Sequence, residues 1–182
     1  MGQLNWDIST TLEGFITNKD GDMDWIIMGE ECGYPHDGSR NLSRIPLLAR
    51  RSRQPRRFRS RENQAVRRHG KVAFSRSLEK ADWDGTRIFR DIVPEEVEGI
   101  KSESRTSIRL DGSANVAQQL TKLGLIDEYR FFVQPVVLGG GQPLFKERMD
   151  LELTGSEQLK NGVILLTYQL ASDNKERLQH AS

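Results

Sequence analysis

The chain has 182 residues and a mass of 20.8 kDa, which is enough for one domain with its own hydrophobic core. Its single cysteine, Cys32, excludes an intramolecular disulfide and a cysteine-based zinc cluster. No stretch approaches the roughly 20 apolar residues of a membrane-spanning helix, and the first residues lack the features of a signal peptide. We therefore expect a cytoplasmic protein that does not enter membranes.

The N-terminal part of the chain predicts a strand followed by a bend. A strand is favoured at Leu4–Ile8, and the letters TTLEGFI continue it past a bend at Gly14. The next letters, NKDGDMDW, faintly resemble a calcium-binding loop. In that alignment Ile16 and Ile27 would occupy the first and last ligand positions, so we expect a turn and no bound metal.

The segment 32–70 differs in composition from the rest of the chain. Between Arg40 and Lys71, eleven Arg and one Lys stand against a single acid, Glu62, which gives a local charge of +11 in a chain of formal net charge +1. Apolar residues are sparse throughout segment 32–70, and three prolines interrupt it. A segment of this kind buries too little apolar surface to fold by itself, so we expect it to be largely disordered.

Three explanations of this segment are open: a basic arm that binds nucleic acid, a solvated insertion, or a reading-frame error in the gene. We rank the reading-frame error first, because codons can be chosen for residues 30–49 whose one-base shift reads as a helical pattern. Nucleic-acid binding is less favoured, because Phe58 is the only aromatic residue between Arg40 and Lys71 that could stack on a base.

A short buried strand is predicted at Val72–Phe74. Three residues that can contact an anion follow it: Ser75, Arg76 and Ser77. Two hydroxyls and a guanidinium at the carboxyl end of a strand suit a phosphate, although they equally suit an ordinary strand end with a surface arginine. Further along, Pro94 and the two glutamates after it predict a helix that runs to about Lys101.

A strand, a helix and a second strand are predicted between Ile108 and Phe145. Ser113 can cap the helix, and Gly124 is typical of the left-handed residue that ends one. The β-rich run Tyr129–Leu138 then supplies the second strand. The turn before the helix, Asp111-Gly112-Ser113, offers free N–H groups to an anion, but by itself a Gly-Ser pair is more often only a helix cap.

The C-terminal part predicts a β-hairpin. Two β-rich runs, Leu151–Leu159 and Val163–Leu170, are joined through Asn161-Gly162, which is a strong hairpin signal. The three glycines at 139–141 permit a close backbone approach to a ligand or simply form a turn. We expect one domain over residues 1–171, followed by a polar tail at 172–182.

Three segments together resemble a known family. They are LDGSANVAQQL with the following LIDEYRFFVQPVVLGGGQPLF, the N-terminal DISTTLEGFITNKDGDMDW, and the central KVAFSRSLEKADWDGTRI. They cover about two thirds of the chain. Taken in their order along the chain, they resemble the dihydrofolate-reductase-like family, which includes the reductase domain of bacterial riboflavin biosynthesis. The resemblance implies a three-layer α/β/α fold with a mostly parallel twisted sheet and a C-terminal antiparallel hairpin.

The resemblance also implies hydride transfer from NADPH to a pterin-like or pyrimidine-ribose small-molecule substrate. The pyrophosphate would be bound by Gly112, Ser113 and Ala114. The 2′-phosphate that distinguishes NADPH from NADH would be bound by Ser75, Arg76 and Ser77. Gly29, after a second strand expected at Trp25–Gly29, would allow close approach of the cofactor, and Glu13 with Thr11 would lie near the reacting centre.

Two further expectations follow from the resemblance. Related proteins are often dimers, so a homodimer is expected here. Glu30 and Glu31 stand where the family has a cation beside the cofactor phosphates, so we expect weak NADPH binding. A catalytically inactive relative of the family is therefore an alternative to an active reductase.

Overall fold

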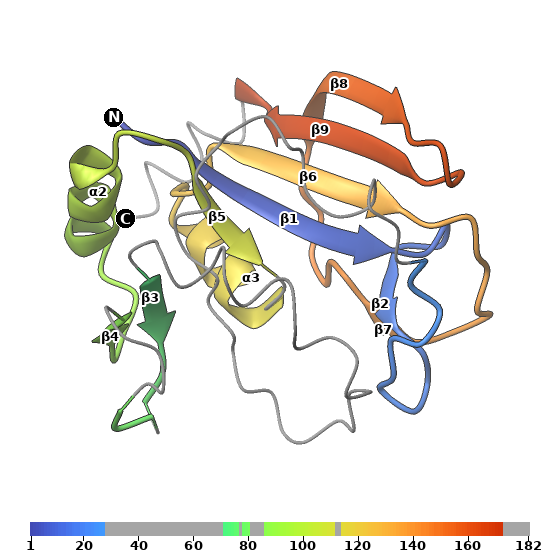
Figure 1. Ribbon diagram of the computed structural model, residues 1–182, viewed down its shortest axis with the longest axis horizontal. Coiled ribbons are helices and arrows are strands. Elements are labelled where there is room, and N and C mark those ends of the chain that lie inside the picture. The colour runs from blue at the N-terminus through green and yellow to red at the C-terminus, as the bar shows by residue number, and fades with distance from the viewer. Residues whose placement is uncertain (28–70, 77, 81–85, 112–113, 173–182) are drawn as a thin grey trace.

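The computed structural model describes residues 1–27, 71–76, 78–80, 86–111 and 114–172, and the fold is given for these residues (Figure 1). Several features expected from the sequence lie outside the described residues: the basic segment 32–70 with the two glutamates before it, the tail from residue 173, and the proposed ligand contacts Gly29, Ser77, Gly112 and Ser113. None of the described helices is long and apolar enough to cross a membrane.

A five-stranded sheet forms the centre of the molecule. Its strand order is β5 (Ile108–Asp111), β1 (Leu4–Thr10), β6 (Glu128–Val133), β9 (Ile164–Leu170) and β8 (Leu151–Gln158). β1 runs parallel to both β5 and β6, whereas β9 is antiparallel to both β6 and β8. The sheet is therefore mixed, with parallel pairing confined to β5, β1 and β6, where the sequence led us to expect a mostly parallel sheet.

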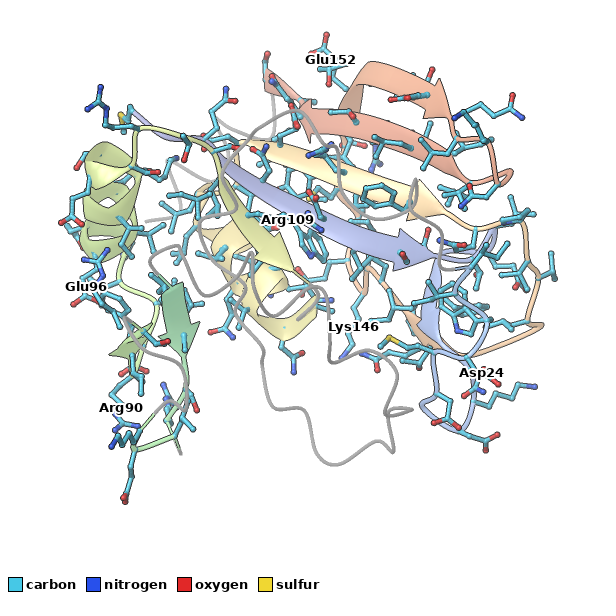
Figure 2. All side chains as sticks on the ribbon, viewed as in Figure 1. Asp24, Arg90, Glu96, Arg109, Lys146 and Glu152 are labelled. Atoms are coloured by element: carbon cyan, nitrogen blue, oxygen red, sulfur yellow. The ribbon has the colours of Figure 1, made fainter. Side chains whose placement is uncertain are left out.

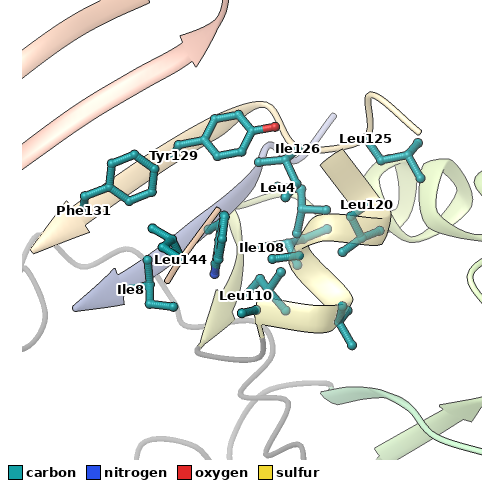
Figure 3. Packing of buried hydrophobic residues seen from close by; sticks show 14 of the residues in the cluster. Leu4, Ile8, Ile108, Leu110, Leu120, Leu125, Ile126, Tyr129, Phe131 and Leu144 are labelled. Atoms are coloured by element: carbon teal, nitrogen blue, oxygen red, sulfur yellow. The ribbon is translucent and has the colours of Figure 1, made fainter. Parts of the chain in front are cut away.

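One face of the sheet carries the hydrophobic core. Trp6, Tyr129 and Tyr168 are neighbours across β1, β6 and β9, and the first two are fully buried. Their rings meet edge to face, with Trp6 and Tyr129 centroids 6.1 Å apart. Figure 3 shows apolar side chains of β1, β5, β6 and the neighbouring helix meeting in one cluster. Burial raises the pKa of Tyr129 to about 12, so its hydroxyl stays neutral and contacts Thr121 at 3.2 Å.

The other face carries a buried ionic cluster, because side chains alternate between the two faces of a strand. Asp7 follows Trp6 on β1, and its carboxylate lies 3.0 Å from Nε of Arg109 and 3.7 Å from Nη1 of Arg130. Burial raises the pKa of Asp7, and the two guanidinium groups partly offset this effect. These ion pairs therefore link β5, β1 and β6.

Two helices belong to the described residues, α2 (Pro94–Glu103) and α3 (Ala114–Lys122). Pro94 begins α2 as expected, and Gly124 ends the α3 segment in the left-handed conformation with φ +66°. Both helices contribute to the same apolar cluster, α2 through Val97 and α3 through Leu120 among others. The second helical layer expected from the resemblance is therefore not confirmed by the described residues.

Two small sheets accompany the central one. β3 (Lys71–Phe74) pairs in parallel with β4 (Thr86–Phe89), and β2 (Phe15–Thr17) pairs antiparallel with β7 (Gln142–Pro143). The sequence analysis missed β4 and β7. It also treated β3 as a central strand, whereas β3 belongs to a separate two-stranded sheet that packs on the core through Ala73.

Two further expectations concern connections. Trp25–Ile27 is turn and irregular backbone rather than the start of the expected second strand, because its described hydrogen bonds go to a turn and to a side chain, not to a neighbouring strand. The β8–β9 hairpin is confirmed: Gly162 has φ +86°, and its N–H donates to the carbonyl of Leu159 at 3.0 Å.

Candidate functional site

The candidate site lies at the carboxyl edge of the parallel strands. Because β1 and β6 run in the same direction, their last residues, Thr10 and Val133, are paired at one edge of the sheet (Figure 1). The chain leaves β1 through Thr11 and leaves β6 through Gln134. In open α/β sheets, ligands bind outside the carboxyl ends of parallel strands, so this edge is where a binding site is expected.

Thr11 holds the turn that follows β1. It is buried, and its hydroxyl oxygen accepts hydrogen bonds from the N–H groups of Glu13 at 3.3 Å and Phe15 at 3.1 Å. Its own N–H donates to the carbonyl of Phe15 at 2.9 Å, and Gly14 completes the turn with φ +80°. Thr11 therefore fixes the position of Glu13, as a residue with a small hydroxyl can do in a tight turn.

The Glu13 carboxylate binds the loop after β6. It accepts hydrogen bonds from the N–H of Leu138 at 2.7 Å and from that of Gly139 at 3.1 Å. Gly139 has φ +68°, a conformation that glycine adopts without strain. Glu13 thus joins the turn after β1 to the glycine loop, and both segments border the carboxyl edge. The sequence predicted a residue near the reacting centre, but not this contact with the backbone.

The glycine run makes a close approach to the chain itself. A Cβ atom added to Gly141 would lie 1.9 Å from the carbonyl oxygen of Thr17, which no side chain could tolerate. The contact brings β7 against β2 next to the site. Gly141 is therefore required for the close approach of β7 to β2.

Gln134 is a site residue that the sequence analysis missed. Its side chain is fully buried, its N–H donates to the carbonyl of Thr10 at 2.8 Å, and its Oε1 accepts from the N–H of Ile27 at 3.1 Å. Its Nε2 is buried and has no acceptor in the part of the chain that the structure describes, and the same holds for the indole Nε1 of Trp25, two residues before Ile27. A signal was available, because Gln134 interrupts the apolar run RFFVQPVV at a strand end.

Ser75 and Arg76 form a second polar turn at the carboxyl end of β3. The Ser75 hydroxyl accepts from the N–H of Leu78 at 3.1 Å, and Arg76 pairs with Asp91 through Nε at 3.0 Å and through Nη2. The Arg76 side chain is 84% exposed. Nη1 of Arg90, which the sequence analysis also missed, donates to the carbonyls of Ser75, Arg76 and Leu78 at 2.8–3.2 Å. Two guanidinium groups, those of Arg76 and Arg90, therefore lie at this turn beside one carboxylate, that of Asp91.

The structure does not bring the two polar regions together. Figure 2 places Arg90, which binds the Ser75–Arg76 turn, and Asp24, next to Trp25, at opposite ends of the molecule. In the view of Figure 1, β5 and α3 lie between the β3–β4 pair and the β2–β7 pair. A ligand that contacts both regions must therefore be long.

The start of α3 differs from that of α2. The first turn of α3 contains no acidic residue, whereas α2 has Glu95 and Glu96 in its first turn. Acids at a helix N-terminus neutralise its partial positive charge, so α3 retains a charge that favours an anion and α2 does not. Within the described ranges there is no group of three or more His, Cys, Asp or Glu side chains that could hold a metal ion.

Comparison with known proteins gives one family and one fold. A model of the RibD C-terminal domain matches residues 3–165. The uncharacterized protein YyaP of Bacillus subtilis (strain 168) is 32% identical over 174 residues, covering 89% of this chain and 92% of YyaP.

Two solved structures share the fold at low sequence identity. The Thermotoga maritima diaminohydroxyphosphoribosylaminopyrimidine deaminase/5-amino-6-(5-phosphoribosylamino)uracil reductase has a TM-score of 0.57 and 12% identity, over 93% of this chain and 57% of that one. The Saccharomyces cerevisiae riboflavin biosynthesis reductase Rib7 has a TM-score of 0.55 and 12% identity, over 94% and 89%.

Proposed function

The chain belongs to the RibD C-terminal domain family, and from that premise we propose that it is an NADPH-dependent reductase of a pyrimidine-ribose or pterin-like substrate. The two solved relatives are named as reductases, one of them of 5-amino-6-(5-phosphoribosylamino)uracil. The observation that carries the proposal is the carboxyl edge of β1 and β6. There a buried donor, Gln134, lies beside the Thr11–Glu13 turn and the glycine loop.

Residues in two regions of the molecule support the proposal of NADPH binding. At the carboxyl edge, Gln134 and Trp25 offer buried donors, and the nicotinamide carboxamide has an oxygen that accepts. At the other end, Arg76 offers an exposed guanidinium whose pairing with Asp91 is weak because solvent screens it. A phosphate is a stronger partner, because it binds guanidinium bidentately. Ala114 begins α3, whose first turn contains no acidic residue and therefore favours an anion such as the pyrophosphate.

The residues of the chain bind and orient the reactants. When bound, NADPH supplies the hydride. Thr11 fixes the turn after β1, and Glu13 holds the glycine loop against that turn. In this proposal Glu13 acts through the loop that it positions, and Ser75 and Arg76 bind the 2′-phosphate. Gly29, Ser77, Gly112 and Ser113 remain proposed cofactor contacts.

The test of the proposal is discrimination between NADPH and NADH. Arg76→Ala should weaken NADPH binding about 10-fold and leave NADH binding unchanged, because a charge-assisted contact to the 2′-phosphate is lost. Isothermal titration of both cofactors provides the measurement. Arg148→Ala is the matched control, since Arg148 is 88% exposed and pairs with Asp150, as Arg76 pairs with Asp91. Equal losses for both cofactors would show that Arg76 does not read the phosphate.

A further inference from the structure

The buried amide of Gln134 has one half of its hydrogen bonds made and the other half unmade. Its Oε1 accepts from the N–H of Ile27 at 3.1 Å, while its Nε2, also buried, has no acceptor among the described residues. Exchanging the positions of Oε1 and Nε2 by flipping the amide would not satisfy both groups. It would place the Nε2 donor against the Ile27 donor and leave Oε1 in the position that now lacks an acceptor. The contact with Ile27 therefore fixes the direction in which Nε2 points.

A buried donor without an acceptor is costly. It carries a free-energy penalty of about 1–3 kcal/mol, and folded proteins contain few such groups. The contact with Ile27 uses only the Oε1 acceptor of Gln134, and the Nε2 donor is the half of the amide that this contact leaves unused. The indole N–H of Trp25 is a second buried donor on the segment that Gln134 holds, so this end of the sheet is short of acceptors.

The turns that flank Gln134 expose apolar side chains. Leu12, in the turn after β1, is 61% exposed, and Val137, in the loop after β6, is 64% exposed. The two turns are joined, because the N–H of Leu12 donates to the carbonyl of Val136 at 3.1 Å. A buried donor bordered by exposed apolar side chains matches the two parts of a heterocycle, a carbonyl oxygen and a planar ring face.

We propose that Nε2 of Gln134 donates a hydrogen bond to a carbonyl oxygen on the ring that binds at this edge, which makes Gln134 a specificity-determining residue. The inference rests on the proposed function and adds a residue to it. Two rings there carry such an oxygen, in the nicotinamide carboxamide and in the pyrimidine of the substrate. Gln134 also positions Trp25–Ile27 through Oε1, so one side chain links the ligand to this segment.

Two substitutions separate the two roles of Gln134. Gln134→Glu keeps an acceptor for the Ile27 N–H and removes the donor once the new carboxyl is ionised, so it is titrated at alkaline as well as neutral pH, whereas Gln134→Met removes both. The probes are NADPH and 2′-phospho-ADP-ribose, which lacks the nicotinamide ring, together with 5-amino-6-(5-phosphoribosylamino)uracil as the pyrimidine probe. Dissociation constants are measured by isothermal titration, and thermal unfolding of each variant checks that it is folded.

Both variants should bind one ring-bearing probe about 10-fold more weakly than the wild-type protein, and both should bind 2′-phospho-ADP-ribose as the wild-type does. A loss confined to NADPH assigns the carboxamide oxygen, and a loss confined to the pyrimidine probe assigns the substrate carbonyl. A structural defect would instead weaken 2′-phospho-ADP-ribose as well, and would appear in Gln134→Met but not in Gln134→Glu. That pattern, or unchanged binding of every probe, overturns the inference.

The same titrations distinguish failure of the proposed role of Gln134 from failure of the proposed reductase function on which it rests. If the wild-type protein binds NADPH and the variants bind it equally well, along with the pyrimidine probe, a buried water satisfies Nε2 and only the role of Gln134 is wrong. If the wild-type protein binds none of the three probes, the proposed reductase function fails, and the role of Gln134 fails with it.

Discussion

The two edges of the parallel strands differ in which buried polar groups are paired. At the amino edge, the buried ammonium of Lys101 on α2 contacts Glu98 at 3.1 Å and Asp127 at 3.0 Å. Asp127 in turn accepts from the N–H of Leu4, the first residue of β1, at 2.7 Å. At the carboxyl edge, Gln134 keeps a buried donor without an acceptor among the described residues. Near the amino edge, the buried oxygens Asn5 Oδ1 and Thr106 Oγ1 also lack a partner among the described residues, whereas at the carboxyl edge the unpaired atoms are the N–H donors of Gln134 and Trp25. In our proposal these two donors make the carboxyl edge the binding edge.

The backbone shows the same contrast. The amino edge is closed by direct contacts, for example from the N–H of Gly2 to the carbonyl of Lys101 at 2.7 Å. The carboxyl edge is made of two turns joined by a side chain, in which Glu13 holds Leu138 and Gly139. Loops that carry function are often positioned on a rigid scaffold in this way. Substitutions at the two edges should therefore have different effects, on stability at one and on binding at the other.

The largest expected effect is at the amino edge. Lys101→Met should lower the free energy of unfolding by about 2–3 kcal/mol and the Tm by about 5–10 °C, because it leaves Asp127 without its buried cation. This loss is smaller than the roughly 3–5 kcal/mol usual for breaking a buried ion pair, because the partner carboxylates are partly exposed and solvent screens them. Urea unfolding measures the change.

A matched control and a binding measurement sharpen this prediction. Lys122→Met removes an exposed pair with Glu147, so it should change stability by less than about 0.5 kcal/mol. At a temperature where Lys101→Met is folded, it should bind NADPH as the wild-type protein does. Loss of NADPH affinity in the folded variant would mean that the amino edge also serves binding, and the contrast between the edges would fail.

A smaller effect is expected at the carboxyl edge. Glu13→Gln keeps one acceptor for the glycine loop and loses the charge, so the local stability of the loop should fall by about 1 kcal/mol, with little change in global stability. Hydrogen exchange of the Leu138 and Gly139 amides should then quicken about fivefold. Glu152→Gln is the control, because Glu152 lies on β8 at the far side of the sheet (Figure 2). Unchanged exchange in Glu13→Gln would show that the hydrogen bonds from the Leu138 and Gly139 amides to Glu13 are not formed in solution.

Local features of the fold could be predicted from the sequence because their causes lie within a few residues. Pro94 began a helix, Gly124 ended one, and Asn161-Gly162 closed a hairpin, each by its own backbone preference. The pairing of strands was harder to predict from the sequence. β3 could be identified as a strand, but its partner β4 and its place outside the central sheet depend on long-range contacts.

The site shows the same limit. Thr11 and Glu13 were identified through a family resemblance, yet the partner of Glu13 is a loop 125 residues away. Gln134 was missed because its meaning depends on Ile27, 107 residues earlier in the chain. Arg90 was missed for a similar reason, since its three carbonyl partners precede it by 12 to 15 residues. Residue type indicates what a group can bind, but only the fold shows which bonds are left unmade.

The claim that the carboxyl edge binds and the amino edge stabilises is tested most directly by hydrogen exchange of the wild-type protein with and without NADPH. Slower exchange with NADPH is predicted in residues 10–17 and 133–141, which border the carboxyl edge, and no change is predicted in residues 2–5 and 125–128 at the amino edge. Protection that appears at the amino edge instead, or equally at both edges, would contradict the account.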